Sequence, residues 1–235
     1  MEPAMVMTTH KHHDHSGGNI EMREIFPNIQ ILGGANDNVP GATRGLENEE
    51  KLTVGDLQIT CYHTPCHTRG HMLYLFEEAG VGESMDHVSG SANGYQVNME
   101  VNRCVFTGDT IFVGGCGRFF EGEPHEMVAA MALARDKLPG NTKMYCGHEY
   151  TIANLNFCAL VDPENEHVLA KKEWAESVRA NDDWTMPSTL SDEKKFNVFM
   201  RCFDADVQAL TGTSDANACM GFLRQWKNSG NRPQL

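Results

Sequence analysis

Four histidines and one aspartate fall within six consecutive positions near the start of the chain. Imidazole and carboxylate groups are preferred ligands of zinc, iron and manganese. His10, His12 and Asp14 alternate, so in an extended loop their side chains lie on one side, with His15 next to them. One ion cannot use them all. The stretch therefore predicts two metal ions, with His10 and His12 on the first and Asp14 and His15 on the second.

Three further segments repeat one design, in which an expected strand ends in a turn of small residues that presents a metal-type side chain. They are residues 63–71 (His-Thr-Pro-Cys-His-Thr-Arg-Gly-His), residues 106–110 (Phe-Thr-Gly-Asp-Thr) and residues 145–150 (Tyr-Cys-Gly-His-Glu-Tyr). A glycine beside a ligand lets the backbone approach a metal ion closely. These segments are expected to supply the remaining ligands.

Taken in order, the four motifs resemble those of the metallo-β-lactamase superfamily. The Cys-Gly-His-Glu-Tyr ending and the helical segments after it are similar to glyoxalase II, the hydroxyacylglutathione hydrolase family. The resemblance implies a first ion held by His10, His12 and His67, a second held by Asp14, His15 and His148, and a bridge between them from Asp109. Two divalent ions are implied, most consistent with zinc, although iron and manganese suit the same ligands.

The activity implied by the resemblance is hydrolysis of S-(2-hydroxyacyl)glutathione thioesters, such as S-D-lactoylglutathione, to glutathione and a 2-hydroxy acid in methylglyoxal detoxification. A hydroxide that bridges the two ions would attack the thioester carbonyl, with Asp14 and Asp109 as the catalytic side chains that hold the ions. Two cations offset by two aspartates and one hydroxide leave a net positive charge, which can stabilise an oxyanion or a leaving thiolate.

By the same resemblance, the glutathione part contacts Arg118, Phe120, Tyr150, Arg224 and Lys227. Arg224 and Lys227 are three positions apart on an expected helix, so they share a face that can meet a carboxylate. Phe120 stands where many relatives have a tyrosine. A hydroxyl contact to the thiol donor is therefore absent, and we expect weaker affinity.

Other conspicuous side chains are expected to have supporting roles. His13, His63 and His71 fit packing or hydrogen bonds to the ligands better than direct ligation. Glu149 is expected to orient a neighbour. The cysteines inside the motifs are not expected to be nucleophiles, because a metal-bound hydroxide makes a protein nucleophile unnecessary.

The composition describes a globular chain of 235 residues with 40% hydrophobic and 22% charged side chains. Its net charge of −13 argues against nucleic-acid or anionic-membrane partners. Eight scattered cysteines without a Cys-x-x-Cys pair indicate free thiols in a reducing cytosol. We expect a cytoplasmic monomer that binds a small glutathione thioester, and a mitochondrial location if an upstream segment is missing.

Strands and helices must position these motifs. Strands are predicted at residues 4–9, 28–32, 52–62 as a hairpin, 72–76, 104–107 and 143–146, and helices at 19–25, 124–138, 152–161, 163–181, 204–210 and 215–227. Residues 33–50 and 80–102 are expected to form irregular connections. Because strand patterns end near residue 150, we predict a metallo-β-lactamase-like αββα sandwich over residues 1–150 and an all-α glutathione-binding domain over residues 151–235.

The N-terminal end of this α/β fold is short. The related family has strands and a helix ahead of the metal loop, whereas here only the apolar run at residues 4–7 precedes it. That run is typical of a strand covered on both faces, so we expect part of one sheet to lie open. Two alternatives remain, which are a persulfide dioxygenase-like enzyme with a single iron and a truncated inactive form.

Overall fold

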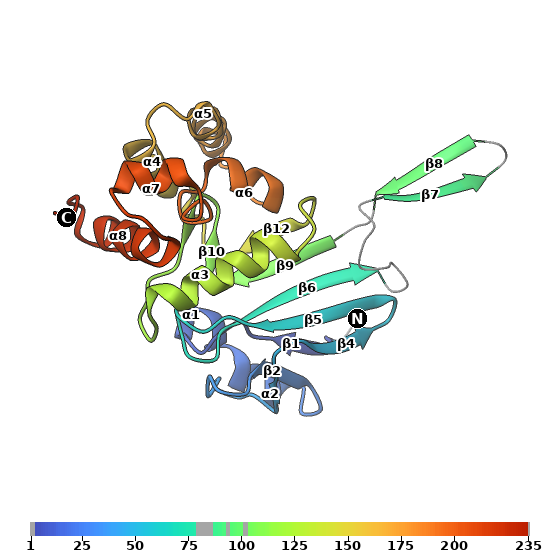
Figure 1. Cartoon of the computed structure of the whole chain (residues 1–235). Helices are drawn as coiled ribbons and strands as arrows, with labels where there is room; N and C mark the ends of the chain where they lie inside the picture. Colours follow the sequence, from blue (N-terminus) through green and yellow to red (C-terminus); the bar gives the residue numbers. More distant parts are fainter. Residues whose placement is uncertain (1–2, 79–86, 93–94, 101–102, 235) are drawn as a thin grey trace.

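The computed structural model describes residues 3–78, 87–92, 95–100 and 103–234. Its centre is a six-stranded mixed sheet with the strand order β13-β12-β9-β6-β5-β4 (Figure 1). These strands are β4 (Glu50–Val54), β5 (Leu57–His63), β6 (Met72–Glu78), β9 (Arg103–Gly108), β12 (Lys143–Cys146) and β13 (Ser188–Thr189). Neighbouring strands are antiparallel except β9 and β12, which run parallel.

A smaller, parallel sheet packs on one face of the large one. It consists of β1 (Met5–Met7), β2 (Gln30–Gly34) and β3 (Arg44–Leu46). Leu32 and Leu46 from this sheet join Ile59, Met72 and Tyr74 from the large sheet in one buried apolar cluster. The short helix α2 (Asn19–Ile25) lies on the side of the smaller sheet that faces away from the large one, whereas α1 (His13–Ser16) lies at the left end of the strands (Figure 1).

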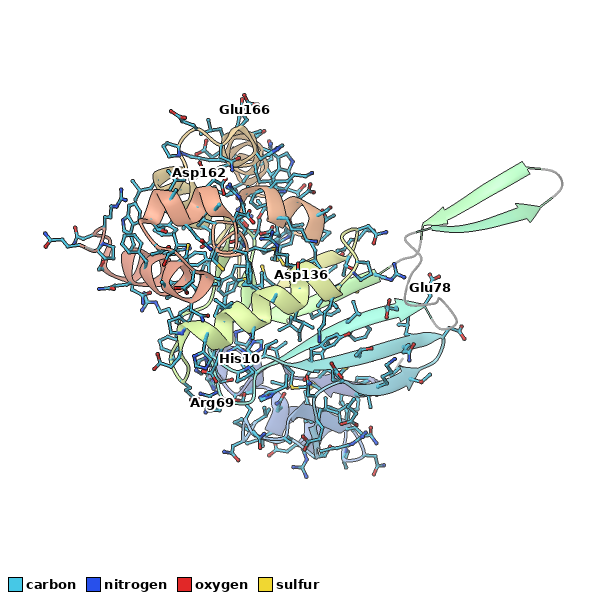
Figure 2. The ribbon with its side chains drawn as sticks, in the orientation of Figure 1. His10, Arg69, Glu78, Asp136, Asp162 and Glu166 are labelled. Carbon is cyan, nitrogen blue, oxygen red and sulfur yellow. The ribbon has the colours of Figure 1, made fainter. Side chains whose placement is uncertain are left out.

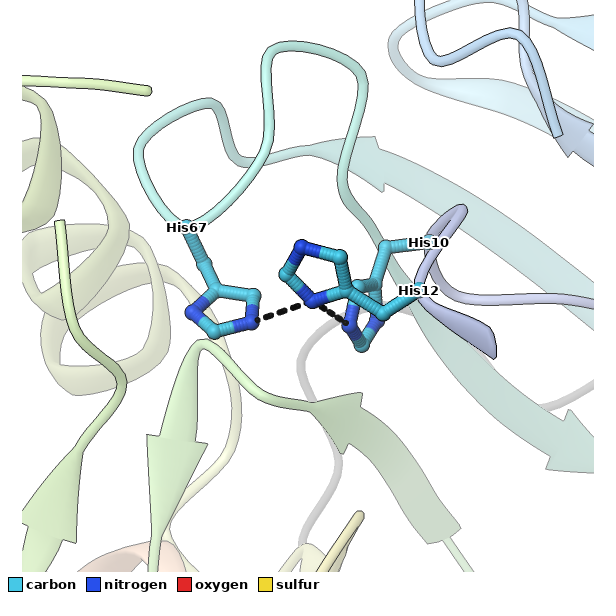
Figure 3. A group of neighbouring side chains, drawn as sticks. All are labelled: His10, His12 and His67. Carbon is cyan, nitrogen blue, oxygen red and sulfur yellow. Dashed lines mark hydrogen bonds between the residues drawn. The ribbon is translucent and has the colours of Figure 1, made fainter. Parts of the chain in front are cut away.

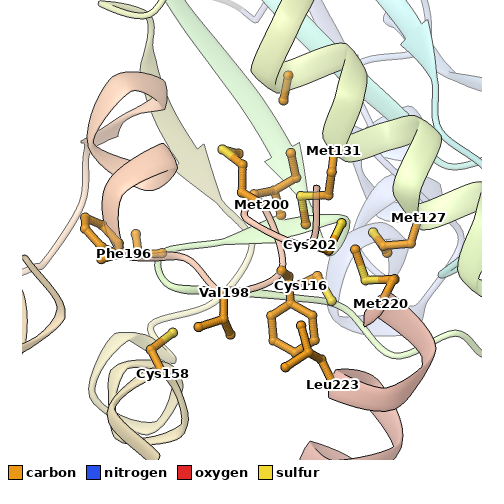
Figure 4. Packing of buried hydrophobic residues seen from close by; sticks show 14 of the residues in the cluster. Cys116, Met127, Met131, Cys158, Phe196, Val198, Met200, Cys202, Met220 and Leu223 are labelled. Carbon is orange, nitrogen blue, oxygen red and sulfur yellow. The ribbon is translucent and has the colours of Figure 1, made fainter. Parts of the chain in front are cut away.

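Helices cover the opposite face of the large sheet. Helix α3 (Pro124–Ala132) continues into a π-helical turn, η1 (Leu133–Lys137), and buries Met127 and Met131 in the main core. That core extends into the C-terminal helices α4 (Thr151–Val161), α5 (Glu166–Ala180), α6 (Leu190–Phe196), α7 (Ala205–Thr211) and α8 (Ala216–Ser229), as Figure 4 shows. The expected αββα sandwich with a helical C-terminal part is confirmed.

Several short elements differ from the sequence prediction. The connection at residues 33–50 contains β3, and residues 188–196 contain β13 and α6, none of which has a long enough periodic pattern to be recognised. A hairpin of β7 (His87–Ala92) and β8 (Tyr95–Glu100) lies in the expected loop at residues 80–102, the rest of which is outside the described residues. The tight pair β10 (Ile111–Phe112) and β11 (Gly115–Cys116) was also not predicted.

The N-terminal strand is half-buried despite its fully apolar pattern, in agreement with the expectation that part of one sheet lies open. Among the described residues, β2 is the only strand that pairs with β1. Beside it lies an open apolar cavity of about 360 Å³ between the two sheets, whose wall includes Met5, Leu57 and Phe106. None of the described helices is both long and apolar enough to cross a membrane.

Candidate metal centre and substrate cavity

Strand ends bring the four motifs to one edge of the sandwich. β9 and β12 are parallel neighbours, so the residues after them, Asp109 and His148, emerge side by side. The N–H of Gly147 donates to the carbonyl of Gly108 at 2.9 Å and holds the two turns together. Gly108 has a φ of +47°, and a Cβ there would lie 2.6 Å from Thr9 Oγ1. Only glycine fits this position, because the turn is left-handed and is crowded by the chain that leads to His10.

The first predicted ligand set is assembled. His12 Nδ1 lies 3.0 Å from His10 Nε2 and 3.1 Å from His67 Nε2 (Figure 3). Ligand atoms of a tetrahedral zinc ion with bonds of about 2.0–2.1 Å are roughly 3.3–3.4 Å apart. The three imidazoles therefore converge at a spacing close to that which a single ion requires.

The second set is assembled next to it. His148 Nε2 lies 3.2 Å from both His15 Nε2 and Asp14 Oδ2. Asp109 stands between the sets, with its carboxylate oxygens 3.2 Å from His15 Nε2, 3.4 Å from His148 Nε2 and 3.6 Å from His67 Nε2. All seven residues that the resemblance implied as ligands thus lie in one cluster.

The backbone conformation of the histidine stretch differs from the expected extended loop. From His13 the chain forms the single helical turn α1, because the N–H groups of His15 and Ser16 both donate to the carbonyl of His12. The hydroxyl of Ser16 donates to the carbonyls of Lys11 and His12. The turn, rather than strand alternation, brings Asp14 and His15 to the second set.

Burial favours the neutral, cation-binding form of two of the predicted ligands, His10 and His67. Burial, followed by the neighbouring imidazoles, lowers the pKa of His10, and burial lowers that of His67. His67 Nδ1 donates to the carbonyl of Arg118 at 2.9 Å, which leaves the lone pair on Nε2 facing the cluster. Burial opposes protonation of His15, but Asp109 and Asp14 outweigh it and raise its pKa. Neutral imidazoles beside carboxylates form a donor set that fits divalent cations.

His71 and Glu149, outside the ligand sets, form hydrogen bonds to neighbouring groups. The buried His71 accepts the N–H of Asp109 at 3.1 Å through Nε2, and its Nδ1 lies 3.0 Å from the Thr110 hydroxyl. Glu149 accepts the N–H of Thr185 at 3.0 Å. Burial raises the pKa of the Cys146 thiol to about 11, which disfavours the nucleophilic thiolate.

A cavity of about 420 Å³ opens beside the metal cluster and contains the five residues implied as substrate contacts. Its wall includes His67, Asp109, Arg118, Phe120, Tyr150, Arg224 and Lys227. Arg224 is only 6% exposed, and its Nη1 donates to the carbonyl of Cys116 at 3.1 Å. Lys227 donates to the amide oxygen of Asn154. Both cations are thus held by groups from the wall of the cavity.

Phe120 lies at the mouth of the cavity and is 60% exposed. Its ring centroid is 5.1 Å from that of His67 and 5.7 Å from that of His12. The phenyl ring therefore shields one side of the first ligand set.

Sequence reasoning missed three residues around this centre. Phe112 and Asn154 line the cavity, and the fully buried Asp37 binds two of the metal loops from behind. Phe112 follows the recognised Gly-Asp-Thr motif closely, which could have drawn attention to it. Asn154 lies in a segment predicted as a helix and Asp37 in one predicted as an irregular connection. Nothing in the sequence around either residue indicated a functional role.

Comparisons with known proteins agree with this geometry. Residues 5–148 match the family model of the metallo-β-lactamase superfamily, and residues 149–230 match that of the hydroxyacylglutathione hydrolase C-terminus. The hydroxyacylglutathione hydrolase named cytoplasmic from Arabidopsis thaliana is 40% identical over 95% of this chain and 80% of its own length. The chain belongs to the hydroxyacylglutathione hydrolase family.

A second relative supports the same family, and a solved structure supports the fold. A hydroxyacylglutathione hydrolase-like protein from Gallus gallus is 37% identical over 97% of this chain and 74% of its own length. The crystal structure of ETHE1 from Myxococcus xanthus has a TM-score of 0.56 at 20% identity and covers 98% of this chain and 71% of that one, which supports the fold. Together with the histidine and aspartate cluster, membership of the superfamily indicates divalent metal binding.

Glu193 links the helical part to the cavity wall and makes the stability of the fold depend on pH. It accepts the N–H of Gly114, in the turn before Cys116, at 2.9 Å, and burial raises its pKa from 4.5 to about 7. As the pH rises from 4.5 to 7, the unfolded chain releases this proton while the folded chain keeps it. Glu193 therefore lowers the free energy of unfolding increasingly across this window, and the penalty is complete above pH 7.

We predict that Glu193→Gln raises the free energy of unfolding at pH 8 by on the order of 1–3 kcal/mol and leaves it nearly unchanged at pH 4.5, because the amide has no proton to lose. Urea unfolding at both pH values measures the difference. Glu173→Gln, an exposed change on α5, is the matched control. The same offset at both pH values would contradict the prediction.

Proposed function

We propose that this chain hydrolyses S-(2-hydroxyacyl)glutathione thioesters, such as S-D-lactoylglutathione, to glutathione and a 2-hydroxy acid. The observation that carries the proposal is a single cavity in which His67 and Asp109 of the metal cluster lie with Arg224 and Lys227 of α8. A thioester whose glutathione carboxylates meet the cations would present its carbonyl group to the metal cluster. The names of the relatives support the same substrate.

The cofactors in this proposal are two divalent ions, with zinc the best fit to a set of five imidazoles and two carboxylates. His10, His12 and His67 would hold one ion, Asp14, His15 and His148 the other, and Asp109 both. Bound there, such ions polarise a carbonyl group and lower the pKa of water so that it attacks at neutral pH. The complete second set disfavours a single-iron dioxygenase.

The side chains around the ions have distinct tasks in this proposal. Asp14 and Asp109 supply the negative charge that offsets two neighbouring cations. Arg118 and Lys227 bind glutathione carboxylates by charge-assisted hydrogen bonds, and Phe120 and Tyr150 form an apolar wall beside the reacting bond. The leaving thiolate is a stable anion, so the cavity needs no dedicated proton donor.

The two family matches meet between residues 148 and 149, which supports a division into a metal-binding domain over residues 1–150 and a glutathione-binding domain over residues 151–235. We further propose that the chain acts as a monomer in the cytoplasm. The Arabidopsis relative named cytoplasmic supports the location. The strongly acidic charge supports a small-molecule partner over a nucleic acid or a membrane.

The metal pair can be tested by removing its shared ligand. We expect the purified chain to contain two divalent ions and to hydrolyse S-D-lactoylglutathione. Asp109→Ala removes a ligand from both sets, so metal content should fall well below two ions and turnover by at least about a hundredfold. Asp14→Ala, which affects the second set alone, should retain about one ion.

Metal content per chain and thioester hydrolysis are measured on the same preparations. Asp136→Ala, whose carboxylate is 62% exposed on η1, serves as the control and should keep both values. A single iron in the unaltered chain would favour the dioxygenase alternative. Full metal content in Asp109→Ala would remove this residue from the bridge, and inactivity of the fully metallated chain would contradict the proposed reaction.

Substrate binding can be separated from chemistry at Lys227. Lys227→Ala removes one charge-assisted contact to glutathione, so KM for the glutathione thioester should rise about tenfold with little change in kcat. A thioester without peptide carboxylates should be unaffected. Gln225→Ala, an exposed neighbour on α8, is the control. Equal losses on both substrates would show that Lys227 supports the fold and does not bind glutathione.

A further inference from the structure

Asp37 is a buried carboxylate that lies behind the metal cluster and outside both ligand sets. It is fully buried in the turn between β2 and β3. Its Oδ2 accepts the N–H of Lys11 at 2.7 Å, and its Oδ1 accepts the N–H of Gly70 at 3.0 Å. Among the described residues no lysine or arginine forms a salt bridge with it. Burial of a carboxylate costs free energy unless hydrogen bonds compensate for the lost water, and these two N–H groups provide that compensation.

The two donors belong to the two loops that form the first ligand set. Lys11 lies between His10 and His12, and Gly70 lies three residues after His67 in the loop between β5 and β6. Figure 2 shows the first of these loops, marked by His10, at the same end of the sandwich as Arg69, the neighbour of Gly70. One carboxylate therefore connects the backbones that present all three imidazoles.

The other contacts of these loops either fix the chain before His10 or are partly exposed. The N–H of Met72 donates to the carbonyl of Thr9 and the Tyr74 hydroxyl donates to the carbonyl of Thr8, and these bonds fix the chain before His10. Past His10, Glu121 also joins the two loops, because it pairs with the Lys11 ammonium group and accepts the Arg69 N–H at 2.8 Å. Both side chains of that ion pair are partly exposed, so it contributes less rigidity. The bond from the Lys11 N–H to Asp37 is buried at the carboxylate end and charge-assisted, so it is the stronger restraint.

The carboxylate itself has little freedom to move. A Cβ at Gly70 would lie 2.3 Å from the backbone nitrogen of Asp37, and a Cβ at Gly34 would lie 1.9 Å from the carbonyl oxygen of Gly70. The backbones of the turn and of the second loop are therefore in direct contact. The N–H of Asp37 also donates to the carbonyl of Gly34 at 3.0 Å. The short Asp side chain therefore meets both donors from a backbone that is itself held in place.

We propose that Asp37 is a positioning residue that sets the spacing between the histidine loop and the His67 loop, and thereby the affinity and geometry of the first ligand set. The proposal rests on the metal centre of the proposed function. Removal of one such hydrogen bond behind a metal ligand weakens metal binding by about 10–100-fold. Asp37 does not line the substrate cavity, so its effect is on the metal and not on the thioester.

The test uses Asp37→Asn, which keeps the shape but turns an NH₂ group toward one of the two N–H donors. The metal-free protein is titrated with Zn²⁺ against a chelating dye, and the Co²⁺-substituted protein is compared by its visible absorption. We expect affinity for the first ion to fall about 10–100-fold with an altered cobalt spectrum, while KM at saturating metal stays unchanged. Asp56→Asn, the same change in the exposed β4–β5 turn, should behave like the unaltered chain.

Amide exchange in the unaltered, metal-free protein tests the contact without a variant. The amides of Lys11 and Gly70 should exchange far more slowly than that of the exposed Gly18, because both donate to the buried carboxylate. Rapid exchange at both, or Asp37→Asn with unchanged affinity and cobalt spectrum, would overturn the positioning role. If the unaltered chain bound no Zn²⁺, the proposed metal centre would fail instead, even with Lys11 and Gly70 protected.

Discussion

The contact on which the site depends is that of the Asp109 carboxylate with nitrogen atoms from both ligand sets. In the proposed centre, two divalent cations in one small cluster would repel each other strongly, and a carboxylate shared between them would reduce that repulsion. Its position is determined from behind by His71, which accepts the Asp109 N–H, and by the left-handed Gly108 before it. The site is therefore organised around one negative side chain whose backbone has almost no alternative conformation.

The sandwich produces this arrangement because its ligands follow strands that end at the same edge. The parallel pair β9 and β12 places Asp109 beside His148, and Met72, the first residue of β6, holds the chain that leads to His10 through its N–H. Burial lowers the pKa of His10 and His67, which favours the neutral form whose lone pair can bind a cation. Rigid strands set the distances, and burial favours the neutral form of these two ligands.

The sequence predicted what depends on residue type and local pattern. The four motifs, the hairpin at Gly55 and the amphipathic helix that begins at Pro124 have a periodicity or spacing that can be recognised in the sequence and that matches the folded structure. The helical turn at His13 could not be predicted, since alternating polar residues suit a strand equally well. Asp37 was missed for a different reason. Its two partners are backbone N–H groups of distant loops, and a contact to the backbone leaves no trace in the identity of the partner residue.

The division of labour between the two parts of the chain follows from the cavity they share. A pair of divalent ions can activate water toward many esters and amides, so the metal cluster alone does not select a substrate. In the proposed function, selection requires fixed charges at a distance from the ions, which Arg118 and the two cations of α8 would supply. Arg224 and Lys227 are themselves held by the carbonyl of Cys116 and by Asn154, in the wall of the same cavity. The Arg224 contact crosses from α8 to the sandwich, and the Lys227 contact joins α8 to α4. In the proposed reaction, the packing of the helices on the sandwich would therefore set the distance from each cation to the metal cluster, so that a group bound in one part orients the bond that reacts in the other.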